Sequence, residues 1–127
     1  MAKIVHSRDG TFLREYPLKI GKFSIGRRPD CDIVLDDTTV SGNHAVIQVS
    51  KNDYMDGLLD IHIEDRGSTN GTQVNGRSIK RHLLKHGEVI RIGLHDLTLV
   101  DEQTRGFEQT EVILPDQTQG MPKSTKK

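Results

Sequence analysis

Short apolar segments separated by tight-turn pairs dominate this sequence, and they restrict its fold more than any other feature. Isoleucine and valine are frequent in these segments, and apolar residues alternate with polar ones instead of recurring at helical spacing. Asp9-Gly10, Asn70-Gly71 and Asn75-Gly76 provide the positive φ angles that tight turns require. We expect strands at residues 19–21, 23–25, 33–35, 45–49, 59–63, 89–92 and 97–100.

About ten short strands with frequent turns predict an all-β sandwich of two antiparallel sheets. Only Arg77–His86 has a helical pattern, and Gly87 ends it. The chain of 127 residues is long enough for one domain, which we place at residues 1–101. Gln, Thr, Glu, Pro and Lys dominate residues 102–127, so we expect a flexible tail there, with Val112–Leu114 as its one apolar patch.

Composition excludes several classes of protein. Cys31 is the only cysteine, which rules out an internal disulfide and a disulfide-stabilised secreted scaffold. The N-terminus is too polar for a signal peptide and no apolar run approaches a membrane span, so we expect a cytoplasmic protein without membrane association. The 18 basic residues balance 18 acidic ones and aromatics make up 4%, which argues against nucleic-acid binding.

Three predicted loops carry polar residues that strands do not need: Gly26-Arg27, Ser41–His44 and Ser68–Thr72. Loops at one end of a sandwich come together although they are distant in sequence. An arginine offers planar, permanently charged donors that fit phosphate oxygens, and serine and threonine add short hydroxyl donors. Nothing in these loops pairs a nucleophile with a base, so they are equipped to bind phosphate, not to transfer it, and no cofactor is implied.

These motifs, in this order, resemble the forkhead-associated (FHA) domain, and in particular its small free-standing bacterial type. Gly26-Arg27, Ser41 with His44, and Asn70-Gly71 fill the family's pattern. The resemblance extends from about Ala2 to Val100. It implies an eleven-stranded β-sandwich that binds phosphothreonine peptides through the loops at one end, as an adaptor in serine/threonine kinase signalling.

The resemblance also implies a role for each loop residue. Arg27 and Ser41 would contact the phosphate, Thr69 would assist them, and Asn70 would hold the peptide backbone. Three residues would support the site without touching the ligand: His44 by bracing the loops, Gly26 by permitting a backbone turn, and Gly71.

The sequence departs from the family at Gly42, where a polar side chain, often arginine, usually follows the motif serine. Arg28 and Asn43 are the neighbours that would replace the missing donor. Like Arg66, however, Arg28 also has the pattern of a solvated surface charge. A module that docks partners without phosphate is therefore the alternative function, while a nucleic-acid-linked regulator and an enzyme have less support.

The remaining candidates are weaker. His82 and His86 have the spacing of a helical metal pair but lack a third ligand at a suitable distance, so we expect no metal site. The expected partner is a threonine-phosphorylated protein, either a kinase or its substrate. Thr110 in the tail is a candidate phosphorylation site, because Ile113 lies at the third position after it, where the family reads an aliphatic or acidic residue. Phosphorylated Thr110 would then bind its own domain or a neighbouring copy.

Overall fold

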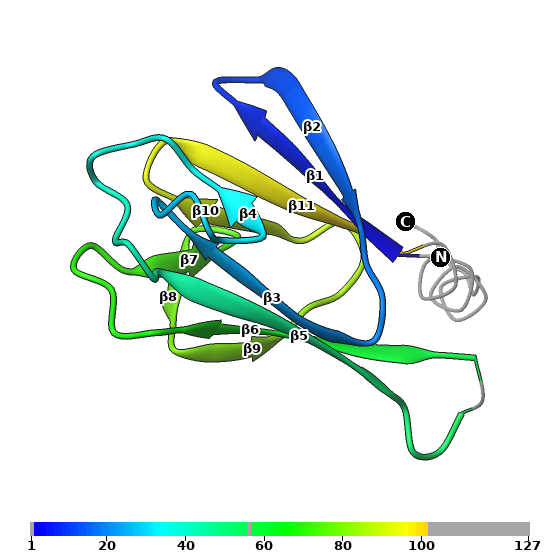
Figure 1. Cartoon of the computed structure of the whole chain (residues 1–127). Coiled ribbons are helices and arrows are strands. Elements are labelled where there is room, and N and C mark those ends of the chain that lie inside the picture. Colours follow the sequence, from blue (N-terminus) through cyan, green and yellow to red (C-terminus); the bar gives the residue numbers. More distant parts are fainter. Residues whose placement is uncertain (1, 56, 102–127) are drawn as a thin grey trace.

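The computed structural model describes residues 2–55 and 57–101, which form a sandwich of two sheets (Figure 1). The predicted tail, with Thr110 in it, lies outside the described residues. The all-β sandwich is confirmed. Its eleven strands are β1 (Ala2–Arg8), β2 (Thr11–Pro17), β3 (Gly21–Gly26), β4 (Ile33–Val34), β5 (Ala45–Lys51), β6 (Leu59–Asp65), β7 (Thr72–Val74), β8 (Arg77–Ile79), β9 (Arg81–Leu83), β10 (Val89–Ile92) and β11 (His95–Asp101).

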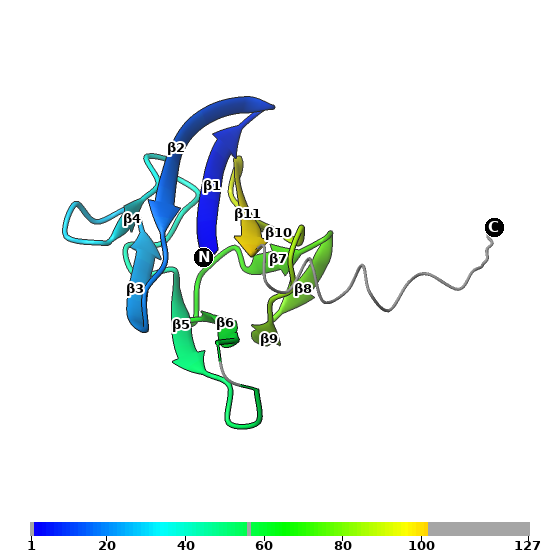
Figure 2. The ribbon, with the colours of Figure 1, turned by 90° about the vertical axis from the view of Figure 1, so that its right-hand side faces the viewer.

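The six-stranded sheet has the order β2-β1-β11-β10-β7-β8, and the five-stranded sheet has the order β4-β3-β5-β6-β9. Figure 2 shows β3, β5, β6 and β9 at the left and bottom of the molecule, and β1, β11, β10, β7 and β8 above and to the right of them. The strand pairs are antiparallel, except that β4 lies parallel to β3, with Ile25 opposite Ile33. Apolar side chains from both sheets fill the space between the layers; those with almost no exposed surface include Ile4, Ile25, Ile33, Leu35, Ile47, Ile61, Ile63, Ile90, Ile92, Leu97 and Leu99.

The sequence-based strand assignment is wrong in three places. Arg77–His86 is not helical, because β8 pairs with β7 in one sheet and β9 pairs with β6 in the other. Residues 19 and 20 are exposed and precede β3, which begins at Gly21. The strands β1 and β2 were not predicted. β2 is an edge strand whose residues are exposed apart from a half-buried Tyr16, which removes the usual alternation, whereas burial does alternate along β1.

Two of the three predicted turn pairs have positive φ angles at both residues, whereas at Asn70-Gly71 only Gly71 does, at 87°. Asn75 and Gly76 both have positive φ angles, 49° and 84°, and connect β7 to β8 as the predicted hairpin turn. Asp9 and Gly10 do the same between β1 and β2, with φ angles of 51° and 78°. These pairs match the turn geometry that fits the natural twist of a hairpin.

Four connections meet at one end of the sandwich, at the left of Figure 1: β3–β4, β4–β5, β6–β7 and β10–β11. The β3–β4 and β4–β5 loops also bond to each other, because Arg27 N–H donates to the Ser41 carbonyl at 3.1 Å. The three predicted loop motifs are therefore neighbours in space. Within residues 2–55 and 57–101, no helix is long and apolar enough to cross a membrane.

Candidate functional site

Arg27 follows the last residue of β3 and is exposed at the loop end of the sandwich. Its backbone is fixed by the hydrogen bond to Ser41. Across residues 2–55 and 57–101, its side chain has no hydrogen bond or ion pair with another protein group. The guanidinium therefore keeps all of its donors for an anion that approaches from solvent.

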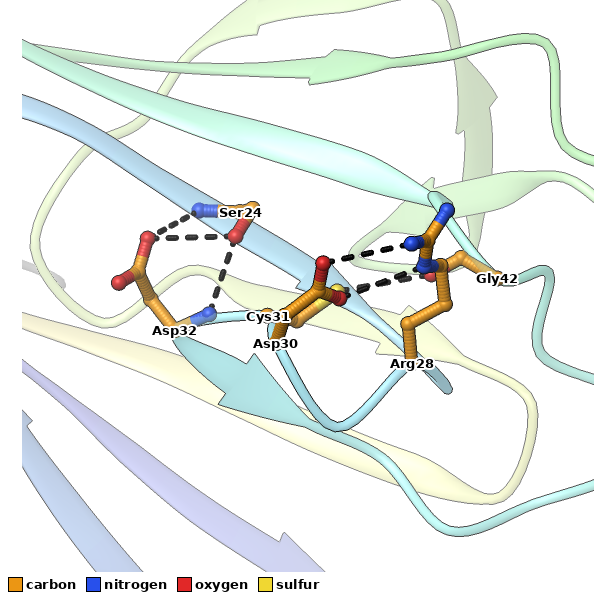
Figure 3. Close-up of polar contacts among 6 residues, drawn as sticks. All are labelled: Ser24, Arg28, Asp30, Cys31, Asp32 and Gly42. Carbon is orange, nitrogen blue, oxygen red and sulfur yellow. Dashed lines mark hydrogen bonds and ion pairs between the residues drawn. The ribbon is translucent and has the colours of Figure 1, made fainter.

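Gly26 allows the two loops on either side of it to approach closely. A Cβ atom at this position would lie only 2.0 Å from the Gly42 carbonyl oxygen and 3.1 Å from Cys31 Sγ. The Cys31 thiol itself donates to that carbonyl oxygen at 3.5 Å, as Figure 3 shows. The φ angle of Gly26 is not positive, so the need for glycine comes from this close approach, and not from the backbone turn that the resemblance implied.

His44 connects two of the loops from a fully buried position. Its Nδ1 accepts a hydrogen bond from Ser41 N–H at 3.0 Å, and its Nε2 lies 2.8 Å from the Gly71 carbonyl oxygen. Because a carbonyl can only accept, Nε2 carries the proton that it donates to Gly71. Nδ1 accepts from an N–H and so carries no proton, which makes the imidazole neutral. The ring thus holds the β4–β5 and β6–β7 loops together without facing the solvent.

Ser41 and Thr69 lie beside each other at the same end. Thr69 N–H donates to Ser41 Oγ at 3.1 Å. Since this bond uses the oxygen of Ser41 as acceptor, its hydroxyl proton remains available to a ligand. Thr69 is exposed, and no protein partner of its hydroxyl is found in the described part of the chain. Ser41 is therefore bonded both to Thr69, through its hydroxyl oxygen, and to the backbone N–H of Arg27, through its carbonyl oxygen.

Asn70 is exposed, and its side-chain amide donates to the Thr39 carbonyl oxygen at 2.8 Å. This bond orients the amide plane and leaves one N–H and the Oδ1 acceptor open. A groove of about 350 Å³ begins beside it. Its lining residues are Thr39, Asn70, Gly71, Gln73, Arg91, Gly93 and Leu94. An extended peptide that contacts Asn70 can continue along this groove.

Asp65 organises the β6–β7 loop, and the sequence analysis missed it. Its Oδ1 accepts from Gly67 N–H at 2.8 Å and Ser68 N–H at 2.9 Å, and its Oδ2 accepts from the hydroxyls of Ser68 and Thr72. Burial opposes ionisation, but these bonds, led by those from Ser68, outweigh it and hold the pKa of Asp65 below its ordinary value. An aspartate that precedes Gly67 by two residues and Ser68 by three is the local sequence signal of such an Asx turn.

Arg28 and Asn43 are placed differently from the other candidates. Arg28 is paired with Asp30, with Nε 3.3 Å from Oδ1 (Figure 3). Its side chain also lies over Gly42, where a Cβ atom would be 3.2 Å from Arg28 Cγ. Asn43 is exposed and lines a separate groove of about 430 Å³ on the five-stranded sheet, together with Lys22, Ser24, Ala45, Val46, Gln48, Glu64 and Arg66. Neither Arg28 nor Asn43 therefore replaces the donor that is missing at Gly42.

The two histidines at helical spacing do not form a pair. His82 Nε2 lies 2.9 Å from Glu88 Oε1, whereas His86 Nδ1 accepts from the backbone N–H of Asp101. Within the described ranges, no three His, Cys, Asp or Glu side chains are grouped as metal ligands. The strand β9 explains the difference, because His82 lies on it and His86 follows it in a turn, so helical spacing does not apply.

Comparison with known proteins agrees with this geometry. Residues 23–93, more than half of the chain, match the FHA domain family. The chain belongs to the FHA family. The matched region contains the loop residues from Gly26 to Gly93, and 11 strands in two sheets are the architecture that the resemblance implied.

Individual FHA proteins support the assignment. The chain is 36% identical over 83 residues to the glycogen accumulation regulator GarA of Mycobacterium tuberculosis, which covers 65% of this chain and 47% of GarA. A solved FHA domain studied for phosphothreonine-dependent interactions is 30% identical, with a TM-score of 0.64 over 78% of this chain and 96% of the other. EmbR of M. tuberculosis, solved with a low-affinity phosphopeptide, is 35% identical, with a TM-score of 0.64 over 78% of this chain and 24% of EmbR. This chain thus spans about half of the length of GarA.

Proposed function

We propose that this FHA protein binds threonine-phosphorylated segments of partner proteins through the loop end of its sandwich. The observation that carries the proposal is the exposed Arg27 guanidinium, which has no acidic partner within residues 2–55 and 57–101 and whose backbone N–H is bonded to Ser41, the residue with a free hydroxyl proton. A phosphate monoester has close to two negative charges at neutral pH and three acceptor oxygens. Arg27 and Ser41, with Thr69 beside them, supply the charge and the donors that such a group requires.

The peptide backbone would be held by Asn70. Its open Oδ1 accepts from a peptide N–H and its second amide proton donates to a peptide carbonyl, while Thr39 keeps the side chain oriented. The residues after the phosphothreonine would then enter the groove that Asn70 and Leu94 line. Leu94 is 44% exposed, which favours an aliphatic residue at that point of the peptide.

The partner in this proposal is a kinase or one of its substrates, in the cytoplasm. Support comes from GarA, which is described as a regulator, and from the relatives studied with phosphorylated ligands. The loops pair no nucleophile with a base, so the protein acts by binding and not by catalysis. Phosphorylated Thr110 is a further proposed ligand, either for its own domain or for a second copy.

A module that docks partners without phosphate is the second candidate, and Gly42 is the observation in its favour. The position offers no side-chain donor, and the neighbouring Arg28 is already paired with Asp30. The φ angle of Gly42 is not positive, so backbone strain does not explain the glycine. A Cβ atom at Gly42 would lie 3.2 Å from Arg28 Cγ and 3.3 Å from Arg28 Cδ, so the Arg28 side chain would have to move slightly to admit a side chain there.

Calorimetry with one peptide in phosphorylated and unphosphorylated forms separates the two candidates. We expect the phosphothreonine peptide to bind with a micromolar Kd, about −8 kcal/mol. The phosphoserine form should bind more weakly, because FHA domains pack the threonine methyl group. Equal affinity for the phosphorylated and unphosphorylated peptides would reject the phosphate-binding function in favour of phosphate-independent docking.

A further inference from the structure

One carboxylate joins three of the loops at the site. Asp37 lies on the β4–β5 loop, and its Oδ1 accepts from the N–H and the hydroxyl of Thr39 at 2.8 and 2.7 Å. Its Oδ2 accepts from the backbone N–H of Leu94, on the β10–β11 turn, at 3.0 Å. Asp37 and Leu94 are 57 residues apart in sequence, so this bond fixes one loop relative to another and not merely a local turn.

The third loop is reached through Thr39. The carbonyl oxygen of Thr39 accepts the bond from the Asn70 side chain, and the N–H of the same peptide group, that of Val40, donates to the Asp37 carbonyl at 3.0 Å. Val40 is itself buried, with 1% of its surface exposed. The peptide group that orients Asn70 is therefore held by the backbone carbonyl of Asp37 and anchored by the core, while the Asp37 carboxylate holds the N–H and hydroxyl of Thr39 beside it.

Gly93 shows independently how close this contact is. Its φ angle is 61°, and a Cβ atom there would lie 2.6 Å from Asp37 Oδ2 and 2.7 Å from Thr39 Oγ1. Any other residue would push the carboxylate away from the β10–β11 turn. The glycine thus lets the turn approach the carboxylate, and the next residue, Leu94, lines the same groove as Asn70.

We propose that Asp37 is a positioning residue that sets Asn70 and Leu94 relative to each other. It touches no ligand, but it fixes the spacing between the group that holds the peptide backbone and the apolar wall that meets the following residues. Without it, the protein loses affinity for the peptide and part of its preference for an aliphatic residue. This inference rests on the proposed function, because Asn70 and Leu94 act as described only if a peptide binds there.

The variant that tests it is Asp37→Ala, with Asp36→Ala as the matched control. Both remove one aspartate charge from the same loop, but in the described residues the Asp36 side chain has no hydrogen bond or ion pair. Removing hydrogen bonds of this kind corresponds to a loss of about 3- to 10-fold in affinity for a phosphothreonine peptide. We expect that loss for Asp37→Ala and a change within about twofold for Asp36→Ala.

A double-mutant cycle distinguishes positioning from a merely structural effect. If Asp37 acts through Asn70, adding Asp37→Ala to Asn70→Ala should cost little further affinity for that peptide. The ratio of affinities for peptides with isoleucine or lysine at the third position after the phosphothreonine should also fall in Asp37→Ala. Independent, additive losses with an unchanged ratio would overturn the proposal.

Amide resonances of the free protein provide a readout that needs no ligand. The Leu94 backbone amide and the Asn70 side-chain amide should shift in Asp37→Ala and stay in place in Asp36→Ala. If both signals stay in place in Asp37→Ala, the proposal is wrong. If they shift but the wild-type protein binds no phosphopeptide, the proposed function fails while the structural link stands. Should Asp37→Ala not fold, Asp37→Asn, which keeps the volume, is measured in the same way.

Discussion

Among the arginines near the loops, Arg27 is distinguished by its surroundings. Arg28, Arg66 and Arg91 each have a carboxylate oxygen within 3.7 Å, whereas Arg27 has none among residues 2–55 and 57–101. A pair that is exposed to solvent contributes little to stability, but it occupies the donors. The free arginine is therefore the one equipped to take up a phosphate.

Replacing Arg27 by alanine should weaken binding of a phosphothreonine peptide by about 2–4 kcal/mol, because a charge-assisted contact to a dianion is lost. The melting temperature should stay close to that of the wild type, since the side chain contacts no other charged group in the described structure. Calorimetry and thermal unfolding measure the two effects. Arg77→Ala on β8 is the matched control, and equal losses in both variants would show that only net charge matters.

At the level of strands and loops, hydrogen bonds made by His44 and Asp65 fix the conformation of the binding end. His44 joins the β4–β5 and β6–β7 loops, and Asp65 closes the β6–β7 loop on itself. Neither side chain projects from the surface as Arg27 does. Their substitution should therefore affect folding before it affects the chemistry of binding.

His44→Ala should destabilise the fold by about 3 kcal/mol or more, because it leaves a cavity and removes the partners of Ser41 N–H and the Gly71 carbonyl. Urea unfolding measures the loss. His62→Ala, on the outer side of β6, should cost much less because this ring is only half-buried. A His44→Ala protein with unchanged stability but no ligand binding would mean that His44 contacts the ligand.

Acid should loosen the loop end through Asp65. Its folded-state pKa is lowered, so its contribution to stability is complete above the ordinary aspartate value, near pH 4, and is lost as the pH falls through the lower folded value. The pKa of Asp37 is held at about 2, first by the Thr39 hydroxyl and N–H and then by Leu94 N–H, so its contribution is lost only as the pH approaches that value. Melting temperatures measured from pH 6 to pH 2 should therefore fall less steeply below pH 4 in Asp65→Asn than in the wild type.

For the molecule as a whole, the binding end lies opposite the point where the described chain stops. β11 begins at His95, next to the β10–β11 turn, and ends at Asp101, so the described chain stops at the far end of this strand. The nine residues from 102 to 110 span at most about 30–32 Å when extended. That is longer than the seven residues of β11, at about 3.3 Å each.

Phosphorylated Thr110 is therefore predicted to occupy the phosphate-binding site, either within one molecule or between two copies. A tether raises the effective concentration of such a ligand toward the millimolar range, so external peptides should bind more weakly to the phosphorylated protein. Amide shifts at Arg27, Ser41 and Asn70, together with the mass in solution, measure this against a Thr110→Ala control. If neither the shifts nor the mass change, Thr110 is not a ligand of this site.

Local sequence was sufficient for the features that depend on a few neighbouring residues. Alternating Ile and Val residues predicted most of the buried strands, and Asn75-Gly76 predicted its hairpin because positive φ angles are a property of those residues. The order of Gly26-Arg27, Ser41 with His44, and Asn70-Gly71 was sufficient to indicate the FHA family, since these motifs are read along the chain. The candidate loops were identified in this way before their contacts were known.

Only the tertiary structure could decide features that join distant segments. The Asp37 to Leu94 bond, the approach of Gly42 to Gly26 and the passage of the chain from β8 to β9 depend on where the two sheets place their loops and edges. Residue propensities act over a few positions, whereas these contacts arise when burial of the core fixes the relative position of strands far apart in sequence. For the same reason, the sequence identified the groups that can bind phosphate, and packing determined which of them remain free to do so.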